Sequence, residues 1–409
     1  MIQINNKIDC CGCKACGVVC PKGAISFSND NEGFWYPNVN LEACINCHLC
    51  EKVCPELHPN EERLPLRTMA AYYDNKAIVR GSSSGGIFSL LSHIVFSKGG
   101  VVFGASFNST WQVVIDYVES DKDIAKFRKS KYVQADTSDS YLKVKQFLLS
   151  GRIVLFTGTS CQISGLKSYL RKDYDNLITA EVACHGVPSP LVWEKHLNQV
   201  IECHSNGHNL FSVDFRYKAE GWKGYRLHYV FDDGSEWDQC RDDDPYMRGF
   251  VRSLYSRTCC ENCRFKGGRS NADFLLGDLW GSEIVCPSID NNNGVSLVAW
   301  YSKKATLLLP PPKFDKMGSL ISSPHETEKS WLMTGVDIRM THEMQFNEGL
   351  HSIVPHHGKR NVFFRRLLKS KNVDKLIESC LQPSFLERVE CQCHYFCHFL
   401  KSKIVAFLS

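Results

Sequence analysis

Short apolar runs separated by glycine-rich or polar segments recur through the middle of the chain. Residues 99–105 open with Gly-Gly and continue as Val-Val-Phe-Gly-Ala, and two further apolar runs cover residues 152–156 and 177–182. Runs of this length, bounded by glycine and polar residues, predict buried strands. The two later runs each lead through a loop into a segment of helical period. This order favours a partly parallel α/β layer whose loops gather at one edge of a sheet.

Two cysteines are expected between these strands and the helices that follow them. One helix is expected over about 163–170 and another through Trp193 and Leu197, which leaves Cys161 and Cys184 on the loops that connect strand to helix. Other strands are expected at 70–73, 211–215 and 225–231, and a helix at 87–95. After Pro310-Pro311-Pro312 the pattern predicts polar loops, then basic amphipathic helices over 360–380 and 384–408.

The first 55 residues contain two copies of one cysteine spacing: Cys10-x2-Cys13-x2-Cys16-x3-Cys20-Pro21 and Cys44-x2-Cys47-x2-Cys50-x3-Cys54-Pro55. This is the bacterial double-cluster motif, in which the fourth cysteine of each run binds the other cluster. We therefore expect one [4Fe-4S] cluster on Cys10, Cys13, Cys16 and Cys54, and a second on Cys44, Cys47, Cys50 and Cys20. Two short strands, 24–27 and 33–36, are expected between the runs.

Two alternatives to iron-sulfur ligation by these cysteines are weaker. A disulfide scaffold would call for a secretory signal, and the first residues contain no apolar stretch of the needed length. Zinc is the stronger rival, because Cys-x2-Cys pairs also bind zinc. A zinc ribbon has two cysteines in each knuckle, however, whereas each run here has four and ends in Cys-Pro. Cys11 fits neither spacing and is interpreted as a bystander.

Composition narrows the class of protein. The chain has 409 residues, enough for two or three domains, and its 21 cysteines without an export signal indicate thiols kept reduced as metal ligands in an oxygen-poor cytoplasm. No run of about eighteen apolar residues suggests a membrane span. The formal charge of +4 is too small to indicate nucleic acid. The basic residues concentrate in 359–409, where peripheral contact with a membrane surface is an alternative to a solvated helix face.

A third metal site is suggested by cysteines from three loops. Cys161 and Cys184 each follow a predicted strand, and Cys260-x2-Cys263 is a chelating pair of the kind found in iron-sulfur and zinc loops. Four thiolates from these loops would complete a [4Fe-4S] site. The alternative is that Cys161 and Cys184 are small buried hydrophobic residues, since free cysteine is among the most buried residue types.

Two further motifs carry weaker signals. Ser82-Ser83-Ser84-Gly85-Gly86 leads into a helix and is a candidate anion cradle, although serine is also a routine N-cap. Neither a Rossmann fingerprint nor a Walker motif is present. Near the end, Cys391-x-Cys393-His394-x2-Cys397-His398 suggests metal, but its spacing is not standard and its aromatic neighbours favour a packing or partner-contact helix.

Taken together, the motifs resemble the coenzyme F420 hydrogenase/dehydrogenase beta-subunit family, in the form with an N-terminal double-cluster ferredoxin domain. The matching segments are 82–88, 98–105, 131–134, 156–162, 184–190, 260–266 and 272–281. Two positions depart from the family pattern. Ser160 stands where proline usually precedes the cysteine, and Cys259 adds a thiol beside the ligand pair, which leaves open which of the two neighbours binds.

The resemblance implies cofactors and a fold. Family members hold FAD beside one [4Fe-4S] cluster and exchange electrons with a deazaflavin. By resemblance, Cys161, Cys184, Cys260 and Cys263 would bind that cluster, and Ser83, Ser84, Gly85, Gly86, Lys131 and Tyr132 would help to seat the flavin. The expected architecture is α+β and multidomain: a ferredoxin-like domain over 1–58, a linker over 59–67, a mixed α/β flavin and iron-sulfur domain over 68–310, and a helical basic tail over 311–409.

The leading hypothesis is a cytoplasmic iron-sulfur flavoprotein oxidoreductase. Its clusters would relay electrons between a low-potential carrier, ferredoxin or coenzyme F420, and a flavin and substrate site. Similar proteins also occur among genes for surface polysaccharides, which makes polysaccharide biosynthesis one setting for it. The alternative is a non-catalytic electron-transfer subunit that docks through its basic tail to a larger redox partner. A third hypothesis is a redox sensor in which the clusters only hold the fold together.

Overall fold

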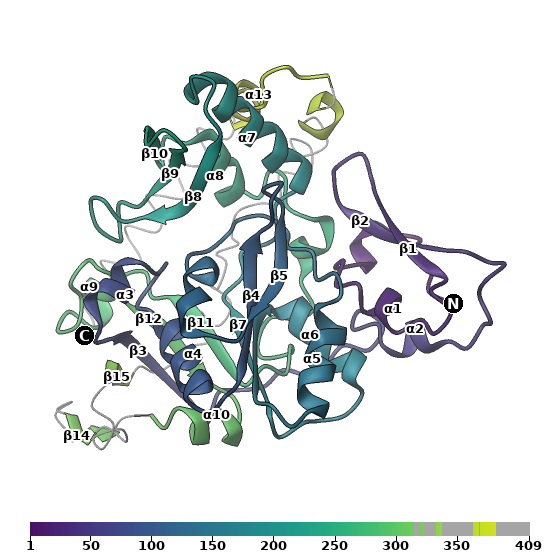
Figure 1. Cartoon of the computed structure of the whole chain (residues 1–409), viewed down its shortest axis with the longest axis horizontal. Helices are drawn as coiled ribbons and strands as arrows, with labels where there is room; N and C mark the ends of the chain where they lie inside the picture. Colours follow the sequence, from purple (N-terminus) through teal and green to yellow (C-terminus); the bar gives the residue numbers. More distant parts are fainter. Residues whose placement is uncertain (312, 315–319, 323–332, 338–362, 368, 382–409) are drawn as a thin grey trace, which may run out of the picture.

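A mixed sheet forms the centre of the molecule (Figure 1). The computed structural model describes residues 1–311, 313–314, 320–322, 333–337, 363–367 and 369–381. In this part of the chain the eight-stranded sheet has the order β15-β3-β12-β11-β7-β6-β4-β5. Its strands are β3 (Arg67–Tyr73), β4 (Val101–Phe107), β5 (Val113–Val118), β6 (Val154–Thr159), β7 (Leu177–Val182), β11 (Phe274–Asp278), β12 (Ser296–Trp300) and β15 (Met333–Asp337). The four strands β4, β6, β7 and β11 run parallel, and the others are antiparallel to their neighbours.

Both faces of this sheet are covered, as the continuous apolar runs predict. In β4, Val101 and Phe103 belong to the core on one face, and Val102 belongs to the core on the other. Helices α5 (Ser140–Leu149) and α6 (Ser160–Leu170) pack on the first face, and α4 (Ile87–Ser97) packs on the second. Because β6, β7 and β11 run parallel, the loops that follow them meet at one edge of the sheet.

A smaller antiparallel sheet with helices lies beside the main sheet. Its order is β10-β9-β8, with β8 (Leu210–Tyr217), β9 (Arg226–Phe231) and β10 (Glu236–Cys240). Helices α7 (Pro190–His204), α8 (Pro245–Val251) and α13 (Val373–Leu381) pack together here. His196 on α7 is buried and its Nδ1 lies 2.8 Å from the Asp374 carboxylate on α13, which fixes this C-terminal helix to the body of the protein.

The N-terminal residues form a compact lobe at the side of the main sheet (Figure 1). A hairpin of β1 (Ile25–Asn29) and β2 (Trp35–Val39) confirms the two strands expected between the cysteine runs. The helical turns η1 (Lys7–Asp9), α1 (Ala15–Val18) and α2 (Leu49–Lys52) complete the lobe, with η1 against η3 (Thr258–Asn262) and α1 against α6. The remaining elements are α3 (Lys76–Arg80), η2 (Asp121–Phe127), α9 (Ser282–Val285), α10 (Lys303–Leu308), β13 (Lys313–Phe314) and β14 (Leu320–Ser322).

Helix α6 begins earlier than the sequence predicted. The expected start was near residue 163 with Cys161 on a loop, but the helix begins at Ser160 and holds Cys161 in its first turn. The cause is a capping box, in which the Thr159 side chain and Gln162 each accept from a backbone N–H at the helix start. Cys161 is therefore held by regular helix geometry.

The C-terminal part also differs from expectation. The single helix expected over 360–380 consists of a helical stretch at 363–367 and α13, with 369–372 outside any helix. Asn372 accepts from the backbone N–H of Lys375 and caps α13, which explains the break. Segment 311–409 was expected to hold loops and helices, yet it also supplies β15 at the sheet edge. The helix predicted over 384–408 and the cluster at Cys391–His398 lie outside the described residues. Within the described ranges, no helix combines the length and apolar character needed to cross a membrane.

Candidate metal centres and cofactor site

Four cysteines of the N-terminal lobe line one cavity with about 380 Å³ of empty space. We call them the outer thiol set: Cys20, Cys44, Cys47 and Cys50. The backbone N–H groups of Ala24 and Ile2 donate to the sulfurs of Cys20 and Cys50, at 3.3 and 3.2 Å. Cys47 is exposed, so this set opens to solvent. These four cysteines are those expected to hold the second cluster.

A second group, the inner thiol set, consists of Cys10, Cys13, Cys16 and Cys54. Burial raises the pKa of Cys16 well above its usual value, and the neighbouring thiols of Cys10 and Cys54 raise it further. Cys13 interacts with Cys16 and Cys54 in the same way. The structure thus brings Cys54 of the second run to three cysteines of the first, which is the exchange that the motif predicts. Which sulfur binds which cluster stays a prediction.

The loop thiol set consists of Cys161, Cys184, Cys260 and Cys263, the four residues suggested for a third metal site. All four line a cavity with about 420 Å³ of empty space, together with Cys11 and Glu56 of the N-terminal lobe. Burial raises the pKa of Cys184 far above its usual value, and the thiols of Cys260, Cys161 and Cys263 raise it further. Burial likewise raises the pKa of Cys263 to about 12. Metal coordination would remove this cost by neutralising the buried thiolates.

Cys259 and Cys260 differ in their surroundings. Both line the cavity, but a hydrogen bond with Cys259 lowers the pKa of Cys260 to about 7. The same hydrogen bond raises the pKa of Cys259 well above its usual value. Cys260 is the member of the pair that forms the Cys-x2-Cys spacing with Cys263, so it stays the candidate ligand.

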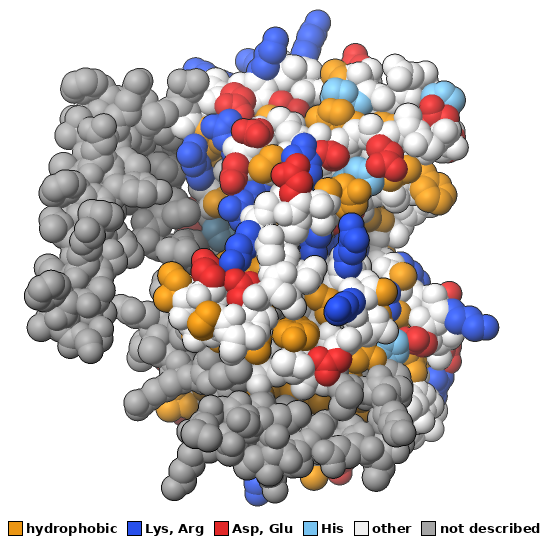
Figure 2. Space-filling model, turned by 90° about the vertical axis from the view of Figure 1, so that its left-hand side faces the viewer, with side chains coloured by type: hydrophobic (Ala, Val, Ile, Leu, Met, Phe, Trp, Pro, Cys, Tyr) orange, Lys and Arg blue, Asp and Glu red, His pale blue; other side chains and the backbone are white. Residues whose placement is uncertain are grey.

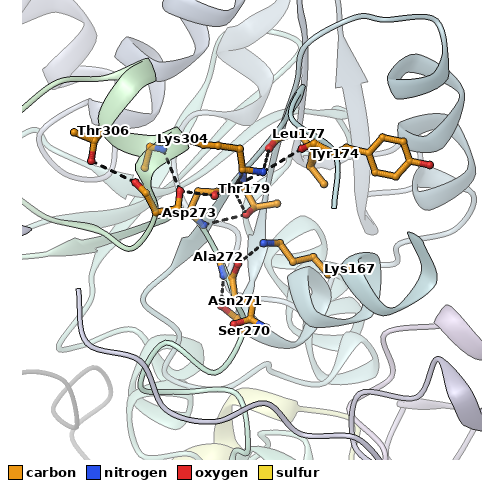
Figure 3. Close-up of polar contacts among 12 residues, drawn as sticks. Lys167, Tyr174, Leu177, Thr179, Ser270, Asn271, Ala272, Asp273, Lys304 and Thr306 are labelled. Atoms are coloured by element: carbon orange, nitrogen blue, oxygen red, sulfur yellow. Dashed lines mark hydrogen bonds and ion pairs between the residues drawn. The ribbon is translucent and has the colours of Figure 1, made fainter. Parts of the chain in front are cut away.

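Hydrogen bonds at the far end of β7 and β11 set the positions of the segments that carry the loop thiol set (Figure 3). The Asp273 carboxylate accepts from the backbone N–H and the hydroxyl of Thr179, at 2.9 and 2.8 Å, and from the Ser302 hydroxyl at 2.6 Å. Lys167 of α6 donates to the carbonyl of Asn271. These bonds join α6, β7 and the segment after Cys263, which together present all four thiols.

Replacing Thr179 by valine is expected to destabilise the protein by about 1–3 kcal/mol, because the buried Asp273 carboxylate would lose the hydroxyl that donates to it at 2.8 Å. The Asp273 N–H would keep the Thr179 carbonyl as an acceptor at 3.0 Å. The matched control is Thr306→Val, since the Thr306 hydroxyl makes a longer bond of 3.3 Å to a carbonyl of its own helix start. Thermal unfolding monitored by circular dichroism should show a lower midpoint for the first variant, and equal midpoints would contradict the assigned role.

Cys11, interpreted from its spacing as a bystander, lies between two thiol sets. It is 4 % exposed and hydrogen-bonds with Cys13 of the inner set and Cys161 of the loop set. Gln134 donates to its carbonyl at 3.2 Å, and Thr137 donates to the carbonyl of Cys13 at 3.1 Å. The N-terminal lobe is therefore docked so that its inner set adjoins the loop set. The sequence contained no signal for this contact beyond an extra cysteine.

The predicted flavin loop is held firmly against the sheet. The Ser84 hydroxyl donates to the carbonyl of Val295 at 2.9 Å, and the Gly85 N–H donates to the Ser296 hydroxyl at 2.9 Å. A Cβ at Gly85 would lie 2.5 Å from the Ala71 carbonyl oxygen, so only glycine fits there. Gly86 has a φ of +81° and precedes α4 as its N-cap. Ser83 bonds the hydroxyl and N–H of Ser130, beside Lys131.

Lys131 and Tyr132 have different surroundings. Burial lowers the pKa of Lys131 to about 7, and its ammonium donates to three carbonyls of its own loop, those of Lys126, Arg128 and Lys129. That arrangement shapes the loop and directs the amine inward. The Tyr132 hydroxyl instead accepts from Arg216 at 2.9 Å. Tyr132 and the Ser83 loop are thereby connected through one arginine.

Arg216 joins the residues of this polar site, and no motif in the sequence pointed to it. It is 1 % exposed and donates to Tyr132, to the Asp278 carboxylate at 2.6 Å and to the Ser83 carbonyl at 2.9 Å. Its Nε and the second oxygen of Asp278 have no partner among the described residues. Arg216 is one of two charged residues in β8, with Asp214, and the alternating pattern of that strand gave no local signal for it. The nearest hint was Asp278, which belongs to a segment that carried the family resemblance.

Two family models match the chain. The 4Fe-4S dicluster domain matches residues 9–57, and the C-terminal model of the coenzyme F420 hydrogenase/dehydrogenase beta subunit matches residues 151–310. A chain of the F420-reducing [NiFe] hydrogenase complex from Methanosarcina barkeri aligns with a TM-score of 0.44 and 15% identity, covering 71% of this chain and 90% of that one.

Two curated relatives match the chain in part. The coenzyme F420-dependent sulfite reductase of Methanocaldococcus jannaschii is 26% identical over 198 residues, covering 46% of this chain and 30% of the relative. The F420H2 dehydrogenase of Methanosarcina mazei has a subunit that is 25% identical over 132 residues, covering 30% of this chain and 38% of the relative. The chain thus spans about a third of the length of these relatives. It belongs to the coenzyme F420 hydrogenase/dehydrogenase beta-subunit family, in a form with an N-terminal double [4Fe-4S] ferredoxin domain, and is an iron-sulfur protein related to F420-dependent oxidoreductases.

Proposed function

We propose that this protein is an iron-sulfur flavoprotein that relays single electrons through three clusters between a low-potential carrier and a flavin. The order would be outer thiol set, inner thiol set, loop thiol set, flavin. The observation that carries the proposal is the shared cavity, whose lining combines the loop thiol set with Cys11 and Glu56 of the ferredoxin domain. A separate ferredoxin domain used only as a structural support would not need to reach into that cavity.

The donor set fits a third [4Fe-4S] cluster. Four thiols from three segments converge on one cavity, which is the ligand number and type that such clusters take. Zinc accepts the same donors, so metal identity is part of the test below. The chain's own contribution is to bring Cys161, on a capped helix, opposite Cys184 and the Cys260–Cys263 pair.

The residues around Arg216 fit a flavin. Unpartnered buried polar atoms on Arg216 and Asp278 offer a donor and an acceptor, and Ser83 and Tyr132 are held beside them. Asp278 is the last residue of β11, and β11 pairs with β7 just before Cys184. The polar residues around Arg216 therefore adjoin the loop thiol set. A bound flavin would exchange two electrons as hydride on one side and single electrons with clusters on the other. Arg216 would supply positive charge near it.

Coenzyme F420 is the proposed hydride partner. The relatives named above support it, and so does an exposed aromatic platform beside Arg216. Trp280 is 46% exposed and its ring stacks on Trp222 at 4.6 Å between centroids, with an interplanar angle of 2°. The Arg241 guanidinium lies 5.6 Å from the Trp280 ring. Figure 2 shows Lys and Arg side chains, with Asp and Glu among them, across the middle of one side of the molecule. A flat, anionic cofactor can stack on an exposed tryptophan that has a guanidinium beside it.

Metal and flavin analysis tests the proposal directly. The chain purified and reconstituted without oxygen is expected to hold about twelve iron and about twelve sulfide per chain, as three [4Fe-4S] clusters require, and one flavin. Reduced ferredoxin should bleach the flavin absorbance of the isolated chain. About eight iron with stoichiometric zinc, or no flavin binding at all, would contradict it.

An electron-transfer subunit without its own substrate is the second candidate. One relative that is a dehydrogenase subunit by name favours this candidate. The chain also covers only a small share of that relative's length. The two candidates differ in turnover: an isolated chain that reduces F420 from reduced ferredoxin excludes the subunit-only role. A cytoplasmic location and the polysaccharide setting stay predictions from the sequence and the resemblance, and the proposed docking tail lies mostly outside the described residues.

A further inference from the structure

One buried arginine of the second domain, Arg257, contacts the inner thiol set. Arg257 lies just before η3, two residues from Cys259, and its side chain is 0% exposed. Its Nε donates to the carbonyl of Cys10 at 2.8 Å, and one terminal nitrogen lies 3.6 Å from the Cys10 sulfur and 3.0 Å from the Trp35 carbonyl. The guanidinium therefore contacts a predicted cluster ligand although 247 residues separate the two in sequence.

The lobe is built to receive this guanidinium. The other terminal nitrogen donates to Gln134 at 3.2 Å, and the Tyr36 ring stacks against the group at 4.4 Å. Gly12, between the first two ligands, makes room: a Cβ there would lie 2.8 Å from Arg257 and its φ is +72°. Three of the five N–H groups of Arg257 thus bond fixed oxygen acceptors and a fourth contacts the Cys10 sulfur, which holds the charge in place.

We propose that Arg257 raises the reduction potential of the inner cluster, so that a residue of the second domain adjusts a cofactor of the first. Reduction adds one negative charge to the cluster, and a fixed cation with a hydrogen bond to a ligand sulfur stabilises that charge. Burial strengthens the effect, since charges interact more strongly in a low dielectric. Glu56, 4 % exposed, carries the opposing charge here and is partly neutralised by Arg264 at 3.9 Å.

The outer thiol set has no equivalent cation among the described contacts to its sulfurs, which come from backbone N–H groups and Asn46. The potential of the inner cluster should therefore depend on Arg257 while that of the outer cluster should not. The inference needs only the dicluster domain and not the third cluster or the flavin. Its failure is thus distinguishable from failure of the proposed function, which iron and flavin content on the same samples would report.

The test is a potentiometric titration of the reconstituted full chain, followed by electron paramagnetic resonance. The inner-cluster signal is the one that a Cys16→Ala variant loses. In Arg257→Gln the oxidised-to-reduced ratio of the inner cluster at a fixed potential should rise at least about tenfold, a midpoint about 59 mV lower for one electron. Arg257→Lys, which keeps the charge, should show a smaller change. The outer cluster should not move in either.

Two further variants keep the inference testable if Arg257→Gln does not hold its iron. Gln134→Glu leaves Arg257 in place and sets a carboxylate against it, so the inner midpoint should again fall. Arg63→Gln is the matched control, because Arg63 is also half-buried and bonds a distant segment, donating to the backbone carbonyls of Gly268 and Ala272 and, among the described contacts, to no cysteine sulfur. An inner midpoint unchanged in Arg257→Gln or, should that variant lose iron, in Gln134→Glu would overturn the inference, as would an equal shift in Arg63→Gln.

Discussion

Replacing Cys161 by alanine is expected to lower bound iron from about twelve to about eight atoms per chain and to stop electron transfer from the ferredoxin clusters to the flavin. Cys161 lines the cavity of the loop thiol set and its sulfur hydrogen-bonds with Cys11, so it lies at the point where the two domains meet. Its place in the first turn of a capped helix fixes where its sulfur enters the cavity. Iron assay and flavin bleaching by reduced ferredoxin measure the two effects.

The neighbouring thiols provide the controls. Cys259→Ala removes a buried thiol from the same cavity without removing a proposed ligand, and about twelve iron atoms should remain. Cys260→Ala should behave as Cys161→Ala does. A loss of four iron atoms in Cys259→Ala with none in Cys260→Ala would exchange the two residues in the ligand set. Full iron in Cys161→Ala would remove the third cluster from the proposal.

Local patterns predicted the parts of the site that depend on short spacing. The outer thiol set shares one cavity because the second cysteine run places three of its cysteines within a tight loop. Cys20, the fourth cysteine of the first run, joins them as the double-cluster motif predicts. The strands before Cys161 and Cys184 were visible as apolar runs, and parallel strands bring their ends to one edge. The approach of Cys161 to Cys184 therefore follows from the parallel pairing of β6 and β7.

What the sequence could not predict depends on contacts between distant segments. Arg257 and Cys10 or Arg216 and Ser83 form no pattern in sequence, because a lone arginine in a strand or loop looks the same whether it is solvated or buried. Lys131 was predicted beside a flavin from resemblance, but its ammonium is occupied by three carbonyls. Even the local start of α6 was misjudged, because the Thr159–Gln162 capping box was overlooked.

Replacing Gly165 by a residue with a side chain is expected to push Cys13 of the inner thiol set away from the loop thiol set. Gly165 follows Cys161 by one helical turn, so both lie on the same face of α6. A Cβ at Gly165 would lie 2.8 Å from the Cys13 Cβ and 3.0 Å from its sulfur. Gly165→Val should therefore displace Cys13, cost about 1–3 kcal/mol by overpacking, and lower bound iron toward about eight atoms per chain. Anaerobic thermal unfolding and iron assay measure these effects.

The milder Gly165→Ala variant gives the sharpest test, because two effects predict opposite signs. In mid-helix, alanine is favoured over glycine by about 1 kcal/mol, so helix propensity alone would raise the unfolding midpoint. Contact with Cys13 predicts a lower midpoint and slower flavin reduction through the ferredoxin clusters. Gly224→Ala, where a Cβ would meet no atom within 4 Å, is the control and should change neither. A stabilised Gly165→Ala with wild-type flavin reduction would mean that the two domains do not meet at this helix face.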